Sequence, residues 1–337
     1  MYKNKNLDML VALATPDTLL PLKLVGDRLL DSEGSLFEFS EGRTNVIDFM
    51  SPFLANDNDK SNLDAYNSPN SVDVYRNFLD WLFLTFNTNE IDFRNEIISL
   101  LRLSKGQKVL IVSCGLGEDI SLVMQQIGNT GEVHAQDISK AMVLASADKH
   151  LHDNVFFTIS NANSLPYKSD YFDAVFHFGG INLFGNMKRA ISELNRVCKK
   201  GGKVVFGDEG IAEHLIGSEY YEIAVCNNKL WAKKAPMADL PHGASDIQLN
   251  YYLGNCFYLV SFTSGDKVPH MNIDVPHKGT RGGTARTRYF GKLEGVTEDA
   301  KLLLHERAKL LNISVHDLLE LILRSQLNSI APSIDKS

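Results

Sequence analysis

The chain has 337 residues, more than one average domain requires, so we expect a core domain with additions at both ends. Lys and Arg number 34 against 41 Asp and Glu, a formal net charge of −7, which disfavours wholesale binding to a polyanion such as DNA. The four cysteines show no C-x-x-C spacing, so neither a metal site nor a disulfide framework is indicated, and we expect buried thiols. No apolar run approaches a membrane span, and we therefore expect a cytoplasmic protein.

The first 55 residues read as a small β module. Short apolar runs, LLPLKLV, RLLDSEG, SLFEFSEG and NVIDF, alternate with turn signals. Residues 56–72 are rich in Asn, Asp and Ser, which predicts an exposed linker. Residues 72–86 then predict a helix, with one apolar face made of Val74, Phe78, Trp81, Leu82 and Phe86.

Residues 73–263 form the predicted core domain. From residue 105 onward, apolar strands alternate with amphipathic helices, which indicates a doubly wound α/β fold with a mostly parallel sheet. We predict strands at 108–112, 132–137, 154–160, 173–178 and 203–209. Between them we predict a helix capped by Ser139 and another, 186–200, that ends at Gly201. Segments 246–254 and 255–265 follow one another without a helix, which predicts an antiparallel pair at the sheet edge.

The most informative feature is a glycine-rich turn followed by an acid. The strand at 108–112 runs into Ser113-Cys114-Gly115-Leu116-Gly117, and the next strand ends at Asp137. The glycines allow a turn so tight that a ligand can lie against bare backbone. An acid at the end of the next strand is placed to accept hydrogen bonds from two ribose hydroxyls. The pair therefore indicates the binding end of an adenosyl cofactor.

Further motifs follow in order along the chain: AQDIS with AM after it, SNANSLPY, YFDAVFHFGGINLF and LNRVCKKGGKVVFGD. Together with VLIVSCGLGE they resemble the class I S-adenosylmethionine-dependent methyltransferases, and most closely the type-11 group that includes the ubiquinone and menaquinone C-methyltransferases. The resemblance covers roughly residues 75–263. It implies a Rossmann-like sheet of seven strands and S-adenosylmethionine as the cofactor, and it disfavours a nicotinamide enzyme.

The resemblance also implies roles for individual residues. The turn from Ser113 through Cys114, Gly115 and Leu116 to Gly117 would lie against the methionine moiety, and Asp137 would hold the ribose diol. Around the rest of the cofactor the implied contacts are Ile138 and Met142 at the adenosine, Asn161 and Ala162 at the adenine, and Phe178 and Gly179 at the sulfonium end.

Two departures from the family pattern stand at the turn. Ser113 replaces the first glycine, and Ile111 replaces the acid that usually ends the first strand. Serine is small enough to keep the turn open if its φ is negative. These departures leave an alternative open, a cofactor-sensing or DNA-binding regulator built on a catalytically degenerate methyltransferase scaffold.

The acceptor side is less defined by the sequence. Methyl transfer from a sulfonium is an in-line displacement that depends mainly on positioning and desolvation, so a general base is optional. His177, His214 and Asn182 lie on segments expected to line the acceptor pocket. His177 sits at an apolar strand end, where a core histidine is the commoner outcome, and His214 is the better candidate base. The acceptor itself, and methylation at carbon, oxygen or nitrogen, stay open.

The N-terminal module resembles the zinc-ribbon-like leader of some of these enzymes, but Thr15-Pro16 stands where Cys-Pro would be, so we expect it to be metal-free. In the extension at 264–296, residues 277–292 carry Lys278, Arg281, Arg286, Arg288 and Lys292 and no acid. Arginine forks suit carboxylate or phosphate, so this strip could clamp an anionic acceptor or be a solvated surface.

Residues 297–330 predict a helical hairpin around Leu311-Asn312-Ile313, with Thr297 and Ser314 as N-caps. Its apolar stripes are Ala300, Leu303, Leu304 and Ala308 on the first helix and Leu318, Leu319, Ile322 and Leu323 on the second. Helices this short are marginal alone, so the hairpin should pack on the core or on a second copy, and we favour a homodimer. With RTRYFGKLEG before it, the segment is similar to a ribbon-helix-helix unit. This similarity keeps DNA binding as a minor alternative.

Overall fold

The computed structural model describes residues 5–26, 28–40, 43–50, 57–68, 70–291 and 296–327. The chain divides into two compact units, Met1–Pro269 and His270–Ser337, and each is described by itself.

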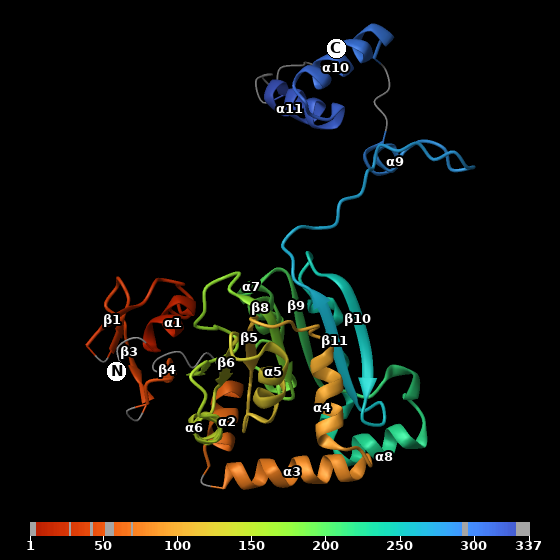
Figure 1. Ribbon diagram of the computed structural model, residues 1–337. Helices are drawn as coiled ribbons and strands as arrows, with labels where there is room; N and C mark the ends of the chain where they lie inside the picture. The colour runs from red at the N-terminus through yellow and green to blue at the C-terminus, as the bar shows by residue number, and fades with distance from the viewer. Residues whose placement is uncertain are drawn as a thin grey trace. The chain divides into compact units, whose positions relative to one another are not determined.

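The first unit is built on one mixed β-sheet (Figure 1). Its centre consists of the parallel strands β5 (Lys108–Val112), β6 (Glu132–Asp137), β7 (Val155–Ile159), β8 (Phe172–Phe178) and β9 (Cys198–Glu209). The hairpin of β10 (Ser245–Tyr252) and β11 (Phe257–Thr263) continues the sheet with β11 antiparallel to β9, which confirms the predicted antiparallel pair. The order β7-β6-β5-β8-β9-β11-β10 reverses direction between β5 and β8. Ligands of open α/β sheets bind at such a reversal, beyond the carboxyl ends of the strands.

The described residues form eleven strands in this sheet rather than the predicted seven. The extra strands are β1 (Lys23–Val25), β2 (Arg28–Leu30), β3 (Leu36–Phe39) and β4 (Val46–Asp48). They form an antiparallel meander, and β4 then pairs in parallel with β7. The predicted strands of the N-terminal module are thus present, but they continue the main sheet and cover the edge of β7, which would otherwise leave backbone groups unpaired.

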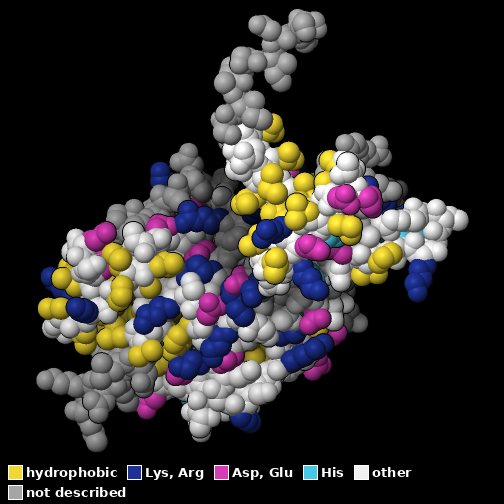
Figure 2. Space-filling view, turned by 90° about the horizontal axis from the view of Figure 1, so that it is seen from above, with side chains coloured by type: hydrophobic (Ala, Val, Ile, Leu, Met, Phe, Trp, Pro, Cys, Tyr) yellow, Lys and Arg dark blue, Asp and Glu magenta, His cyan; other side chains and the backbone are white. Residues whose placement is uncertain are grey.

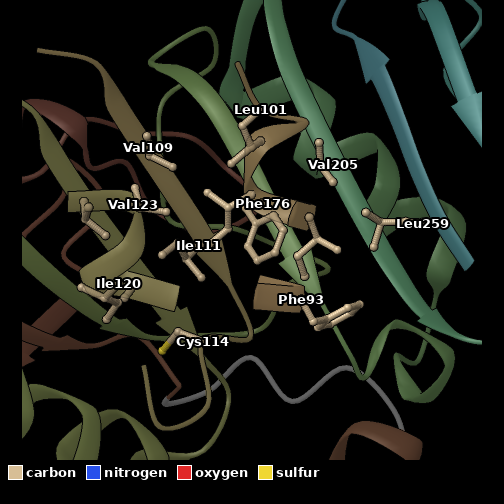
Figure 3. Close-up of a cluster of buried hydrophobic side chains, with 14 of the residues drawn as sticks. Phe93, Leu101, Val109, Ile111, Cys114, Ile120, Val123, Phe176, Val205 and Leu259 are labelled. Carbon is tan, nitrogen blue, oxygen red and sulfur yellow. The ribbon is translucent and has the colours of Figure 1, made fainter. Parts of the chain in front are cut away.

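Helices cover both faces of the sheet, as a doubly wound fold requires. Alternate residues of each strand point to opposite faces, and α4 (Glu90–Ser99), α5 (Glu118–Ile127) and α6 (Lys140–Lys149) supply the apolar side chains on one of them. Figure 3 shows this cluster, in which Val109 and Ile111 of β5 meet Ile120 and Val123 of α5. The opposite face packs against α7 (Met187–Val197) and α1 (Lys5–Ala12), and α1 was not predicted.

The helix predicted to extend over 186–200 ends earlier than expected. The structure ends α7 at Val197 and starts β9 at Cys198, so the two glycines lie inside the strand segment. Gly201 has φ +84, and its backbone N–H donates to the carbonyl of Ser264 at 2.9 Å. This pairing with the chain beyond β11 explains why the segment joins the strand where the glycines predicted only a helix stop.

Two further helices lie at the edge of the sheet where the parallel strands end. These are α2 (Asp57–Tyr66) and α3 (Ser71–Thr85), and Figure 1 draws α3 across this edge. The prediction of a linker at 56–72 was therefore wrong over α2, which is a helix with a buried Asp59, whereas the predicted exposure holds for most of its other described side chains. The predicted helix at 72–86 is confirmed as α3. A shorter helix, α8 (Glu219–Asn227), follows β9.

The second unit contains α9 (Ala285–Phe290), α10 (Glu298–Leu310) and α11 (Val315–Leu327). The Oγ1 of Thr297 accepts from the Ala300 N–H at 3.4 Å, and the Oγ of Ser314 accepts from the Asp317 N–H at 3.0 Å, which confirms both N-caps. The expected ribbon is wrong at 286–290, where a capping box at Thr284 starts a helix. The remaining predictions at 292–295, including Lys292, and at 328–330 lie outside the described residues.

Several leucines of the hairpin formed by α10 and α11 are exposed, and in Figure 2 hydrophobic side chains gather over it. Of its apolar side chains only Ala308 and Leu318 are buried.

None of the helices in the described ranges has the length and apolarity needed to cross a bilayer. All four cysteines are free, and Cys226 is exposed, contrary to the expectation that all four would be buried.

Candidate functional site

A cavity of about 550 Å³ opens at the carboxyl ends of β6, β5, β8 and β9, where the strand order reverses. Helices α2 and α3 supply its other wall. Nine of the twelve residues expected to bind the cofactor line it: Ser113, Gly115, Asp137, Ile138, Met142, Asn161, Ala162, Phe178 and Gly179. The other three do not, because Cys114 and Leu116 point into the core and Gly117 begins α5.

The glycine-rich turn is left-handed at its first residue. Ser113 has φ +52, so the condition that its φ be negative is not met. Gly115 also has a positive φ, and a Cβ built on it would lie 3.3 Å from the ring of Tyr75. A side chain at this position would therefore crowd α3, whereas glycine leaves the backbone bare toward the cavity.

Asp137 holds this turn in place. Its Oδ2 accepts from the Gly115 N–H at 2.9 Å, and its Oδ1 accepts from the Ser139 N–H at 2.9 Å. The carboxyl is 8% exposed, and burial raises its pKa. The side-chain cap of α6 is Ser139, whose Oγ accepts from the Met142 N–H at 3.2 Å. Asp137 thus connects the turn to the end of β6 and lines the cavity as well.

Asn161 is already engaged by the protein. Its Nδ2 donates to Oδ2 of Asp59 at 3.0 Å, and its Oδ1 accepts from the Asn163 N–H at 2.9 Å. The other oxygen of Asp59 accepts from the Gly185 N–H at 3.0 Å. Sequence reasoning missed Asp59, which lies in the segment taken for a linker and lines the cavity beside Asn161.

The opposite end of the cavity contains two consecutive acids that we did not predict as site residues, Asp208 and Glu209 at the end of β9. Asp208 accepts backbone N–H groups from Asn182 at 2.6 Å and from Glu209 at 2.7 Å. Oε1 of Glu209 accepts from Nδ2 of Asn228 at 2.8 Å. Burial raises the pKa of Asp208 to about 6, and burial together with the neighbouring Asp208 raises the pKa of Glu209 to about 7. The sequence feature that could have identified this pair is its position at the end of the fifth predicted strand.

Asn182, an expected acceptor-binding residue, does not line the cavity. Its side-chain Nδ2 donates to the carbonyl of Glu209 at 2.6 Å, and its Oδ1 accepts from the hydroxyl of Tyr258 at 3.2 Å. Asn182 therefore supports the end of β9 without facing the cavity.

Neither candidate catalytic histidine lines the cavity. His177 is fully buried, its Nδ1 lies 3.0 Å from the carbonyl of Val112, and burial lowers its pKa to about 4. It is a neutral core histidine. His214 lies in a short 3-10 helix (Glu213–Leu215) and is exposed. The structure confirms the core histidine that the sequence favoured at position 177, because β8 turns this side chain into the core. The expectation that His214 lines the acceptor pocket was wrong, because the chain after β9 turns it to the surface.

The three arginines predicted to clamp an anionic acceptor belong to the second unit. Arg286 forms a two-point ion pair with Asp274, at 2.6 and 3.0 Å. Nη1 of Arg288 donates to the carbonyl of Gly282 at 2.7 Å. Arg281 is exposed. Two of the three guanidinium groups thus have partners within their own unit.

Comparison with known proteins agrees with this geometry. A family model described as a methyltransferase domain matches residues 103–270. The chain is 31% identical over 116 residues to the demethylmenaquinone methyltransferase of Alkalihalophilus pseudofirmus, covering 34% of this chain and 49% of that protein. It is 33% identical over 110 residues to the ubiquinone/menaquinone biosynthesis C-methyltransferase UbiE of Cupriavidus metallidurans, covering 32% and 45%. The chain thus spans about half the length of these curated relatives.

Among solved structures, the chain is similar to Haemonchus contortus phosphoethanolamine N-methyltransferase 2 in complex with S-adenosyl-L-methionine, with 15% identity and a TM-score of 0.48 over 60% of this chain and 59% of that chain. The matched family and the sequence relatives agree with the motifs described above. In residues 103–270 the chain therefore contains a domain of the class I S-adenosylmethionine-dependent methyltransferases, of the UbiE-like type, and S-adenosylmethionine is the cofactor of this family.

Proposed function

We propose that this chain transfers a methyl group from S-adenosylmethionine to a small molecule bound in the same cavity, by in-line displacement. The observation that carries the proposal is the continuity of the cavity. It begins at the glycine-rich turn and Asp137 and reaches Asp208 and Glu209 three strands away, on the other side of the reversal point. One cavity can thus hold a cofactor and an acceptor side by side, as displacement requires.

The cofactor would take the β5 and β6 side of the cavity. Its methionine moiety would lie against the backbone of Ser113 and Gly115, and its ribose diol would bind Asp137. Ile138 and Met142 would flank the adenosine, and the pair of Asn161 and Asp59 would meet the adenine amine. Phe178 and Gly179 would then border the sulfonium, with its methyl group directed toward β9.

The acceptor would be a small molecule without a strong negative charge. The anionic acceptor suggested by the arginines has little support in the cavity, where Asp208 and Glu209 have no cationic partner among the described residues. Its lining cation, Arg94, is held by Glu90 and Asp119 at 2.8 and 2.9 Å. Uncompensated carboxylates repel an anion at short range.

Titration calorimetry with S-adenosylhomocysteine tests the cofactor part of the proposal. Binding should be saturable, and a crystal of the complex should place the ligand over Ser113–Gly117 with its ribose at Asp137. Incubation with S-adenosylmethionine and fractionated metabolite pools should then release S-adenosylhomocysteine. Cofactor binding without turnover in any fraction, combined with operator binding, would favour the regulator instead.

We also propose a cytoplasmic homodimer joined through the hairpin of α10 and α11. The free cysteines support the location. The dimer is supported by the exposed Leu303, Leu311 and Ile322, which border an apolar groove on the hairpin and need a partner surface. Truncation after Gly295 followed by light scattering tests it: the mass should fall to that of a monomer, and an unchanged mass would exclude a dimer built on this hairpin.

A further inference from the structure

The two acids at the end of β9 differ in how they are held. Both oxygens of Asp208 accept backbone N–H groups, from Asn182 and from Glu209, and its side chain is fixed by them. Glu209 has one side-chain partner, the amide of Asn228, which binds Oε1. Among the described residues nothing else donates to the Glu209 carboxyl, so one of its oxygens remains available to a ligand. Glu209 is only 7% exposed and lines the cavity.

No cation in the described part of the chain pairs with either acid. The titratable groups that face the same cavity are Asp59 and Tyr66 on α2, Tyr75 on α3, Arg94 on α4, Asp137 on β6 and Asp208. Arg94 is committed to Glu90 and Asp119. Without a counter-ion, burial and repulsion by Asp208 raise the pKa of Glu209 to about 7, near the operating range of a general base.

The cavity beside Glu209 is apolar. Its wall there includes Phe257 of β11 and Leu230, next to the Asn228 that binds Glu209. Val74 and Phe78 of α3 also line the cavity, and both are exposed. An apolar wall with one available carboxyl fits a molecule with an apolar body and one polar hydrogen.

We propose that Glu209 is the proton acceptor for a methyl acceptor that presents a weakly acidic O–H or N–H on an apolar, aromatic-sized body. This inference rests on the proposed function. As the acceptor atom forms its bond to the methyl carbon, the carbon–sulfur bond breaks, and its electron pair stays on sulfur and neutralises the sulfonium. The proton of the O–H or N–H goes to Glu209, which later releases it to solvent. Asp208 is a positioning residue, since its backbone bonds fix the end of β9.

The test uses the full chain saturated with S-adenosylhomocysteine and three chromophoric probes, 4-nitrophenol, 4-nitrocatechol and 2-naphthol. Their absorbance reports ionisation of the hydroxyl, so no turnover is needed. Wild type should bind at least one probe as the phenolate at a pH at which the free probe is protonated. E209Q should bind the same probe mostly in its protonated form, with at least a tenfold lower phenolate fraction. E213Q, which changes an exposed acid just after β9, is the matched control and should behave as wild type.

The outcomes separate the two proposals. Failure of wild type to bind S-adenosylhomocysteine refutes the proposed function itself. If the cofactor product binds but none of the three probes does, or if E209Q shows the same phenolate fraction as wild type, Glu209 is not the proton acceptor. The cofactor affinity of E209Q should change by less than threefold, which shows that the variant is folded and that its effect is confined to the acceptor side.

Discussion

The two sides of the cavity differ in the partners of one buried carboxylate, that of Glu209. On the cofactor side, Asp119 pairs with Arg94 at 2.9 Å, and Asp137 accepts two backbone N–H groups. On the acceptor side, Asp208 likewise accepts two backbone N–H groups, but Glu209 has a single neutral amide and no cation among the described residues. The first arrangement fixes charges for binding, and the second leaves a carboxyl able to gain or lose a proton. Hydrogen-bond donors and cations around a carboxyl, rather than burial alone, therefore separate a structural acid from a reactive one.

Removing the compensation on the cofactor side should have the largest effect. Arg94→Met leaves Asp119 buried without its cation, and breaking a buried pair in this way costs about 3–5 kcal/mol of unfolding free energy. Urea unfolding measures it. Arg76→Met is the control, since Arg76 is 36% exposed, pairs with Asp80, Glu90 and Glu118, and should cost only about 1 kcal/mol. Equal losses in the two variants would contradict the distinction.

On the acceptor side the pH dependence should have the opposite sign to that of a paired acid. Because the pKa of Glu209 is raised from 4.5 to about 7 on folding, its contribution to stability is fully present below pH 4.5 and is lost as the pH rises to 7. Glu209→Gln should therefore be more stable than wild type at pH 8, by about 3 kcal/mol, and no more stable at pH 4. Unfolding curves at both pH values, without cofactor, check it. A constant difference would show that Glu209 does not titrate in this range.

Asp137→Ala should weaken S-adenosylhomocysteine binding tenfold to a hundredfold, because a charged hydrogen bond contributes roughly 1.5–3 kcal/mol. Calorimetry measures the change. The variant also leaves the Gly115 and Ser139 N–H groups without their acceptor, so Asp137→Asn, which keeps one oxygen, should recover part of the stability but not all of the affinity. Unaltered affinity in both variants would place the ribose elsewhere.

The smallest effect concerns the strained first residue of the turn. Ser113 holds φ +52, a conformation that costs a side-chain-bearing residue about 1 kcal/mol and glycine almost nothing. Ser113→Gly should raise the unfolding free energy by about 0.5–1 kcal/mol, whereas Ser113→Ala should not. Thermal melts of the two variants compare them directly. A loss of stability in the glycine variant would mean that the hydroxyl contributes more than the strain costs.

Strong local patterns predicted the parts of the fold that depend on backbone geometry. Apolar runs and the Ser139 cap fixed β5, β6 and α6 to within a residue, because burial and capping leave few alternatives. The polar composition of α2 gave no such indication. This helix forms where Asp59 binds Asn161 and Gly185, contacts between residues about a hundred positions apart. Tertiary contacts of this kind override local propensity.

The site was predictable where a motif constrains the backbone and not where a side chain meets an unknown acceptor. The turn at Gly115 and the acid at Asp137 carry such a motif. For His177, only the three-dimensional structure could tell which face of β8 it occupies, because the pattern DAVFHF is apolar on both faces. In the sequence, nothing distinguishes Glu209 from an ordinary residue at a strand end, and only the cavity beside it in the structure indicates a role.

The pairing of β4 with β7 has a consequence for the order of folding during synthesis. Val46 aligns with Phe157, more than a hundred residues later in the chain. The meander of β1–β4 leaves the ribosome before the other strands of this sheet, yet the edge it joins forms only when β7 has emerged and paired with β6. Until then the apolar side chains of Val46 and Ile47 have no sheet to cover them, and exposed strands are prone to aggregation. The strands β1–β4 thus depend on a strand synthesised more than a hundred residues later before they can take their place in the sheet.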